Sequence, residues 1–329
     1  TSPYCTDKNG HGPAWSNSLF EDNAEHGYGM YTAQKVIREN LAEKTHALLA
    51  IDWTAAELKE AAQKWLDTME DGAANKEAAK AYIAALEESI CDGCDCDACK
   101  LASEILSQKD YLSKKSVWIF GGDGWAYDIG FGGVDHVLAQ NEDVNIFVFD
   151  TEVYSNTGGQ ASKASNIGQV AQFAAAGKET KKKSLAEIAM SYGYIYVAQV
   201  AMGANQAQTL KAIAEAEAYH GPSLIIGYAP CEMHSIKGGM MHCQEEMKKA
   251  VDCGYWNMFR FDPSKETGKF TLDSKQPKGG YQEFLMNEAR YSRLTREFPE
   301  RANELFERNE ESAKARYEHL LKLVEMYKD

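Results

Sequence analysis

The sequence predicts an α/β protein in which helices cover both faces of a parallel sheet. From residue 116 onward, short apolar runs alternate with helical patterns of about 10 to 15 residues. Glycine-rich breaks follow the first two of these runs, at the places where parallel strands would end. The 17 Tyr, 12 Phe and 6 Trp residues are too many for a disordered chain. Together these observations favour strands joined by crossover helices.

Composition excludes several classes of function. The 329 residues carry 35 Lys+Arg and 49 Asp+Glu, so the net charge of −14 disfavours binding to nucleic acid or to a membrane surface. No apolar run approaches the roughly 20 residues that span a bilayer. Eight cysteines are too few for a disulfide scaffold, so we expect a reducing, cytoplasmic location. The chain does not begin with Met, which suggests processing or a longer polypeptide.

The first third of the chain is predicted to be helical. A helical pattern covers residues 31–49, and residues 54–110 are rich in Ala, Glu and Lys. The second stretch has 13 acidic and 6 basic residues, a net charge of −7. One helix face there carries the small and apolar residues Ala78, Ala79, Tyr82, Ile83, Leu86 and Ile90. We interpret residues 54–110 as an acidic helical insertion that ends in a cysteine cluster.

The sheet pattern occupies the middle of the chain. Strands are predicted at 117–120, 145–149, 195–200, 224–228 and 258–261, and helices at 130–140, 184–192, 205–219 and 239–252. After Pro263 the sheet pattern stops, and residues 281–327 indicate two helices separated near Pro299. We therefore predict an α/β domain from 1–53 and 111–262, the insertion 54–110, and a C-terminal helical extension 263–329.

Two predicted strand ends carry the chemistry. Gly122-Asp123-Gly124 follows the first strand, and the loop 150–160 follows the second. Glycines let the backbone approach a diphosphate, and an Asp can hold the divalent cation that the diphosphate also binds. Asp123 and Thr151 are 28 positions apart, which is one helix plus one strand. Parallel strands would therefore bring both loops to one edge of the sheet.

Other interpretations of these loops were weighed. A lone Gly-Asp-Gly is more often a tight turn, but two such loops at this spacing favour a magnesium–diphosphate site. A dinucleotide fingerprint is excluded because no glycine stands three residues after Gly124, and no Walker A lysine is present.

The detailed motifs carry a family resemblance. Gly-Asp-Gly followed by a polar loop resembles the thiamine-diphosphate motif. The longer blocks resemble the C-terminal thiamine-diphosphate-binding domain of the pyruvate:ferredoxin (flavodoxin) oxidoreductase family. These blocks are Gly12–Glu25, Gly122–Gly130, Asp150–Gln160, Ala201–Ala207 and Tyr228–Cys231.

The resemblance implies roles for particular residues. Mg²⁺ would be held by the Asp123 carboxylate, the Thr151 hydroxyl and the Val153 carbonyl. Asn156 would be catalytic and point toward the thiazolium and the bound 2-oxoacid. Cys231 would be the fourth ligand of a [4Fe–4S] cluster. The remaining cofactor-binding positions implied by the resemblance are Gly122, Gly124, Trp125, Glu152, Tyr154 and Ser155.

The resemblance also implies an activity and partners. The enzyme would decarboxylate pyruvate oxidatively to acetyl-CoA and CO2, using coenzyme A and passing electrons through [4Fe–4S] clusters to ferredoxin or flavodoxin. Other domains or subunits of the same enzyme and a homodimer are implied as partners. The family's Cys-x-x-Cys pair and third ligating Cys are not in this sequence, so we expect a C-terminal segment of a longer enzyme. A non-oxidative decarboxylase and an inactive assembly module are the alternatives.

The remaining cysteines, histidines and lysines have weaker signals. Cys91, Cys94, Cys96 and Cys99 could bind a metal, form disulfides or be free thiols, and Cys243 and Cys253 are expected in the core. We expect His136 in the core or at the surface, His234 in a surface loop and Lys181–Lys183 at a solvated helix start.

Overall fold

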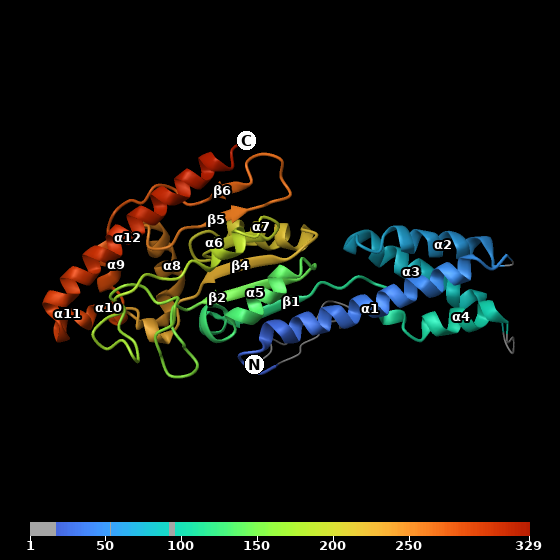
Figure 1. Cartoon of the computed structure of the whole chain (residues 1–329), viewed down its shortest axis with the longest axis horizontal. Coiled ribbons are helices and arrows are strands. Elements are labelled where there is room, and N and C mark those ends of the chain that lie inside the picture. The colour runs from blue at the N-terminus through green and yellow to red at the C-terminus, as the bar shows by residue number, and fades with distance from the viewer. Residues whose placement is uncertain (1–17, 53, 92–95) are drawn as a thin grey trace. The chain divides into compact units, whose positions relative to one another are not determined.

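The computed structural model describes residues 18–52, 54–91 and 96–329, which form two compact units (Figure 1). The sheet unit comprises the chain up to His26 together with Trp118–Asp329, and the helical unit comprises Gly27–Val117. Helix α1 (Asn23–Leu49) begins in the first unit and continues in the second. The predicted block at 12–17 and Cys94 lie outside the described residues. The predicted three-part division of the chain stays a prediction.

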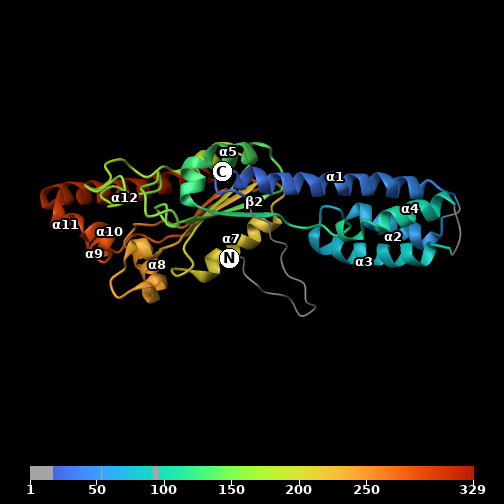
Figure 2. The ribbon, with the colours of Figure 1, turned by 90° about the horizontal axis from the view of Figure 1, so that it is seen from below.

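The helical unit packs α2 (Ala56–Asp67), α3 (Gly72–Ser89) and α4 (Asp97–Leu106) with the later part of α1 (Figure 2). Its core contains Trp65 and Tyr82, whose rings stack with centroids 5.6 Å apart. The predicted apolar face of α3 is confirmed, because Ala78, Ala79, Tyr82 and Leu86 are all buried. Burial of this one face is what stabilises helices whose other faces are acidic.

Six strands form one sheet in the order β1-β2-β4-β3-β5-β6. Four strands are parallel, as predicted: β1 (Trp118–Gly122), β2 (Asn145–Asp150), β3 (Tyr196–Val200) and β4 (Ser223–Tyr228). The short strands β5 (Phe259–Phe261) and β6 (Phe270–Leu272) are antiparallel, so the predicted parallel direction is wrong for the strand at 258–261. Because β6 lies after Pro263, the prediction that the sheet pattern stops there is wrong as well. The connection between β5 and β6 is too short for the crossover that a parallel pair needs.

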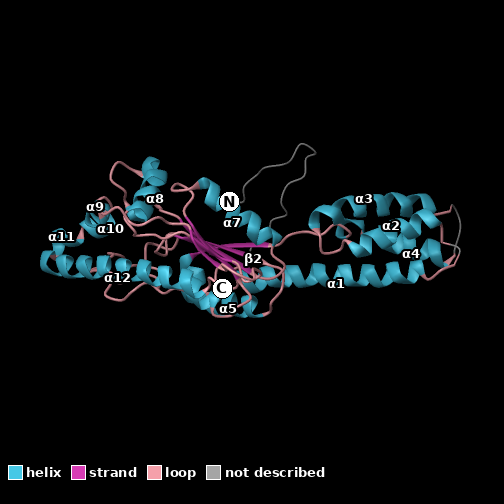
Figure 3. Ribbon diagram, turned by 90° about the horizontal axis from the view of Figure 1, so that it is seen from above, coloured by secondary structure: helices cyan, strands magenta, loops and turns pink. Residues whose placement is uncertain are grey.

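Helices cover both faces of this sheet, as predicted. Figures 2 and 3 both show α5 (Phe131–Ala139) and α12 (Pro299–Met326) on one face, and α7 (Gln206–Ala218) and α8 (Cys243–Asp252) on the other. A further short helix, α6 (Leu185–Met190), contacts β3 and β4. The α7 face buries the apolar residues Tyr196, Ala198, Val200, Ala212, Ala216 and Ile225.

The C-terminal segment differs in detail from its prediction. In place of one helix before Pro299, the chain forms α9 (Tyr281–Met286), α10 (Ala289–Ser292) and α11 (Leu294–Glu297). Pro299 then starts α12, because proline is well suited to the first turn of a helix. Among the described residues, no helix is long and apolar enough to cross a membrane.

Candidate metal and diphosphate site

The site lies at the carboxyl ends of β1 and β2. The two strands are parallel neighbours, and Gly122 at the end of β1 is paired with Phe149 in β2. Asp123 therefore follows β1 at the level of Asp150, the last residue of β2, and Thr151 comes directly after that strand. In open α/β sheets this edge is where ligands bind.

The three predicted magnesium donors meet around the Thr151 hydroxyl. Thr151 Oγ1 is 2.7 Å from Asp123 Oδ1 and 2.8 Å from the Val153 carbonyl oxygen. Neighbouring ligands of an octahedral Mg²⁺ with bonds of 2.0–2.1 Å lie about 3 Å apart, so this spacing fits the ion. A threonine hydroxyl carries one hydrogen and can donate it to only one of these two oxygens. A shared cation would attract all three oxygens.

Asp123 is a buried carboxylate, with 1% of its surface exposed. Ser162 Oγ donates a hydrogen bond to Asp123 Oδ2 at 2.6 Å, and the Thr151 N–H donates to Oδ1 at 3.1 Å. Burial first, and then the nearby Asp150 carboxylate, raise the pKa of Asp123 to about 7. A buried acid beside a second acid is an environment that a divalent cation would stabilise.

Glycines shape the first loop. A side chain at Gly124 would place its Cβ 2.6 Å from the Tyr154 ring. The buried Trp125 ring lies against Gly121 and Gly130, where a Cβ would overlap it. A π-helical turn, Gly124–Ile129, directly follows Asp123, and such turns are frequent at functional sites. The loop is therefore closely packed around backbone that a diphosphate could approach.

The second loop folds back after Tyr154. The Tyr154 N–H donates to the Gln160 carbonyl at 2.9 Å, and the Gly159 N–H donates to the Tyr154 carbonyl at 2.8 Å. Gly158 and Gly159 both have positive φ, which permits this tight reversal. Ser155 is half-buried and Asn156 is exposed at the tip of the loop. The Asn156 amide is thus accessible to a molecule bound beyond the strand ends.

The Glu152 side chain binds two basic residues. Its carboxylate is fully buried, 2.9 Å from Lys182 Nζ and 2.7 Å from Arg290 Nη1. Burial alone would raise the pKa of Glu152, but Lys182 and Arg290 lower it to about 2. Glu152 is therefore an ionised carboxylate held by two cations.

Sequence reasoning missed Ser162, Lys182 and Arg290 as part of this site. The lysine run 181–183 was expected to be solvated, and that expectation is wrong for Lys182. Lys182 Nζ lies 2.7 Å from the buried Asp150 carboxylate. The lysine run itself gives no signal, because its partners lie 30 or more positions away in the sequence.

Cys231 lies just beyond the carboxyl end of β4. Its thiol is half-buried, and its backbone N–H donates to Nδ1 of His234 at 3.1 Å. His234 is fully buried, so its predicted surface position is wrong. Burial, and then the nearby Arg290, lower the pKa of His234 well below its ordinary value. Within the described residues, no three His, Cys, Asp or Glu side chains are grouped so that they could hold a metal.

The other cysteines do not form a described site. Cys91 is exposed, Cys99 is buried, and Cys96 accepts a hydrogen bond from the Cys99 N–H at the start of α4. Cys253 is buried as predicted, whereas Cys243 is only half-buried.

Comparisons with known proteins show which proteins this chain is similar to. Residues 99–226 match the family described as thiamine pyrophosphate enzyme, C-terminal TPP binding domain. The chain is 50% identical over 328 residues to a pyruvate-flavodoxin oxidoreductase of Klebsiella pneumoniae, and 52% identical over 326 residues to the pyruvate:ferredoxin oxidoreductase of Moorella thermoacetica. It is also 44% identical over 329 residues to the mitochondrial pyruvate dehydrogenase [NADP(+)] of Euglena gracilis.

Each alignment covers 98% of this chain but only 27%, 28% and 18% of these relatives, respectively. The chain thus spans less than a third of the length of the curated relatives it matches. Residues 99–226 thus resemble the C-terminal TPP-binding domains of thiamine pyrophosphate enzymes, within a chain that is similar over nearly its whole length to pyruvate-flavodoxin and pyruvate:ferredoxin oxidoreductases.

Proposed function

We propose that this chain is the magnesium- and diphosphate-binding part of an enzyme that oxidises pyruvate with ferredoxin or flavodoxin as electron acceptor. The observation that carries the proposal is the spacing of three oxygen donors: Thr151 Oγ1 lies 2.7 Å from Asp123 Oδ1 and 2.8 Å from the Val153 carbonyl oxygen. The names of the relatives support the substrate and the acceptor.

The residues of the chain would bind and orient the cofactor. Asp123, the Thr151 hydroxyl and the Val153 carbonyl would hold Mg²⁺, which the cofactor diphosphate would also bind. Gly122 and Gly124 would present backbone to the diphosphate. When bound, thiamine diphosphate supplies the electron sink that decarboxylation of a 2-oxoacid requires. Because Asp123 is buried, little water would compete with the cation for its carboxylate.

The remaining predicted positions would complete the surroundings of the cofactor. Tyr154 and Ser155 lead to the loop tip, where Asn156 would face the thiazolium and the 2-oxoacid. Trp125 would pack beside the diphosphate, and Glu152 would contribute by fixing the backbone between Thr151 and Val153, because its carboxylate is held by cations. Cys231 would provide one thiolate to a [4Fe–4S] cluster whose other ligands come from outside the described residues.

We infer that parts of the enzyme outside this segment determine which electron acceptor is used. A relative named for NADP⁺ aligns with 98% of this chain, as do the relatives named for ferredoxin and flavodoxin. Coenzyme A, the other domains or subunits and a second copy of the enzyme remain the proposed partners.

Titration of the full chain with Mn²⁺ and thiamine diphosphate tests the proposal. Electron paramagnetic resonance of free Mn²⁺ gives the dissociation constant of the metal, and circular dichroism reports folding. We expect cofactor-dependent Mn²⁺ binding that Asp123→Asn weakens by at least about 100-fold, because a direct ligand is lost.

Asp128→Asn is the matched control. It removes the same charge five residues away, where the half-buried Asp128 pairs with the exposed Lys163. We expect Mn²⁺ affinity within about twofold of the wild type, because the lysine left without its partner is solvated. A folded wild-type chain that binds neither thiamine diphosphate nor Mn²⁺ would contradict the proposal and favour an assembly module.

A further inference from the structure

A buried group of charged residues lies behind the second loop of the site. We define the loop network as Asp150, Glu152, Lys182 and Arg290. Lys182 Nζ contacts Asp150 Oδ2 at 2.7 Å and Glu152 Oε1 at 2.9 Å, and Arg290 Nη1 contacts Glu152 Oε2 at 2.7 Å. Both carboxylates are fully buried, and the side chains of Lys182 and Arg290 are 14% and 2% exposed.

The network alternates with the magnesium donors along the chain. Thr151 and Val153 supply their oxygens to the candidate metal site, while the side chains of Asp150 and Glu152 bind Lys182. Each donor is therefore next in sequence to a carboxylate that binds Lys182. A shift of the Thr151 hydroxyl or the Val153 carbonyl would disturb at least one buried ion pair.

The backbone between the two donors has an uncommon conformation. Glu152 has φ of 57°, in the left-handed region that non-glycine residues seldom adopt. Its carbonyl accepts hydrogen bonds from Ser165 Oγ at 2.6 Å and from Gln169 Nε2 at 3.0 Å. Such a conformation persists when the surrounding structure over-determines it, and it is concentrated at functional sites.

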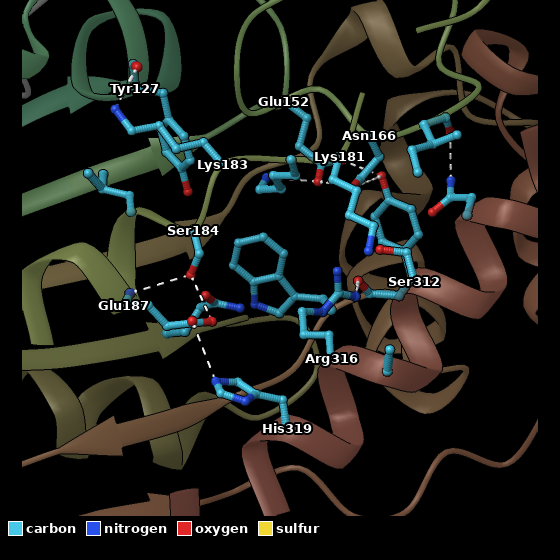
Figure 4. Close-up of a pocket in the computed structure, with 18 residues that line it drawn as sticks. Tyr127, Glu152, Asn166, Lys181, Lys183, Ser184, Glu187, Ser312, Arg316 and His319 are labelled. Atoms are coloured by element: carbon cyan, nitrogen blue, oxygen red, sulfur yellow. Dashed lines mark hydrogen bonds and ion pairs between the residues drawn. The ribbon is translucent and has the colours of Figure 1, made fainter. Parts of the chain in front are cut away.

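The partners of the loop come from distant parts of the sheet unit. Lys182 precedes α6, and Arg290 belongs to α10 in the C-terminal segment. Asn166 Nδ2 adds a hydrogen bond to Glu152 Oε1 at 2.9 Å. Figure 4 shows Glu152 and Asn166 together at one end of a cavity of about 380 Å³, with Arg316 and His319 of α12 at the other. The loop is thus held by residues from the segment before α6 and from α10.

Stability alone does not account for these ion pairs. Replacing a buried ion pair by apolar residues of similar volume is often neutral or stabilising, because desolvating charges is costly. The position of its two carboxylates, each one residue from a magnesium donor of the loop, better explains why these ion pairs are buried here. Groups behind metal ligands orient them, and their loss typically costs 10- to 100-fold in metal affinity.

We propose that Lys182 and Arg290 are positioning residues that fix the spacing of the Thr151 hydroxyl and the Val153 carbonyl for Mg²⁺. The inference rests on the proposed function, because it requires that these oxygens bind the metal. It adds that the C-terminal segment, through α10, takes part in forming the site although it supplies no metal ligand.

Mn²⁺ affinity in charge-matched variants of the full chain tests the inference. Asp150→Asn/Lys182→Met removes both ion pairs of Lys182, and the Glu152 carboxylate that remains keeps Arg290 as its partner. We expect the Mn²⁺ dissociation constant in saturating thiamine diphosphate to rise about tenfold or more. Lys182→Arg keeps the cation and should remain within about threefold of the wild type, which a general loss of packing would not predict.

Lys183→Met is the matched control. Its amine lies over the Phe131 ring and donates to the Tyr127 carbonyl, and it belongs to no carboxylate pair of the network. We expect its Mn²⁺ affinity to equal that of the wild type within about twofold. If the double variant does not fold, Tyr127→Phe removes only the hydroxyl that donates to Asp150 Oδ2 at 2.8 Å, and a rise of about threefold is expected.

The outcomes separate the two proposals. Wild-type chain that binds no Mn²⁺ with thiamine diphosphate overturns the proposed function and this inference with it. Wild-type binding that depends on Asp123, together with wild-type affinity in a folded Asp150→Asn/Lys182→Met variant or in Tyr127→Phe, overturns the positioning role alone.

Discussion

The two units bury polar groups in different ways. In the helical unit, Arg38 is 9% exposed and donates to the carbonyls of Met69, Tyr111 and Leu112 at 2.7 to 2.9 Å. Neutral backbone oxygens thus satisfy its guanidinium. In the sheet unit, Arg290 is paired with two buried carboxylates, Glu152 and Glu288. The same residue type therefore stabilises backbone in one unit and opposite charge in the other.

The exposed ion pairs of the helical unit show the same difference between the two units. Among the described residues of the helical unit, each ion pair has at least one half-exposed or exposed partner, as in Lys44–Glu104 and Lys109–Glu87. Such pairs contribute little to stability. Fully desolvated charges occur instead in the sheet unit, around the loop that carries the magnesium donors. Buried charge, which is costly to desolvate, is thus concentrated around the loop where we place the function.

The largest effect should come from removing the two arginines. Arg290→Met leaves Glu152 and Glu288 buried without their guanidinium partner, which should cost about 3–5 kcal/mol of unfolding free energy. Arg38→Met leaves only carbonyls without hydrogen bonds and should cost about 1–3 kcal/mol. Urea-dependent hydrogen exchange, resolved by peptide, measures the stability of the helical unit in Arg38→Met and of the sheet unit in Arg290→Met.

An Arg38→Met effect as large as that of Arg290→Met would contradict this contrast between the two units. If Arg38→Met destabilised the helical unit as much as Arg290→Met destabilised the sheet unit, buried charge would not distinguish the units. Glu152→Gln/Glu288→Gln/Arg290→Met is the control, since it leaves no lone charge and should recover much of the lost stability.

A smaller effect should appear in the pH dependence of the sheet unit. Burial raises the pKa of Glu288 to about 7, although Arg290 beside it acts in the opposite direction. The folded state then binds the proton more tightly than the unfolded state. Stability from this group is complete below pH of about 4.5 and is lost as the pH rises through 7. From pH 5 to pH 8 the loss should be about 1–3 kcal/mol relative to Glu288→Gln.

Glu297→Gln controls for the removal of a carboxylate in the same segment. Glu297 pairs with Arg293 at the surface, so this variant should follow the wild-type pH profile. Unfolding in urea at several pH values provides the measurement. Parallel profiles for the wild type and Glu288→Gln would show that Glu288 titrates outside this range.

Local signals were enough to predict much of the fold and the proximity of Asp123 and Thr151. The four parallel strands are continuous apolar runs, which single out buried strands. Asp123 and Thr151 each directly follow one of those strands, so their proximity follows from the topology. The strand β6 is not predicted because its three residues, Phe270–Leu272, stand alone within a polar stretch after Pro263.

The groups that hold the loop could not be predicted in the same way. Arg290 is 138 positions from Glu152, and nothing in the local pattern of either residue indicates the other. Lys182 stands within a lysine run, and such runs are usually solvated. Its burial is decided by two acids that the sheet brings beside it. His234 was placed at the surface because a short polar loop gives no sign that one side chain turns inward.

The smallest predicted effect lies in the helical unit. Asp71 caps α3, where its carboxylate accepts the N–H groups of Ala73 and Ala74 at 3.0 and 2.9 Å. Asp71→Ala should cost about 1 kcal/mol, because two backbone donors lose their acceptor and a favourable charge at the helix start is removed. Asp67→Ala removes the same charge at the end of α2, where a negative charge is unfavourable, and should change stability by less than about 0.5 kcal/mol. Hydrogen exchange in α3 peptides measures both. Equal effects of the two variants would mean that Asp71 acts through net charge, and the contrast between backbone-directed and charge-directed polar groups would then fail at this position.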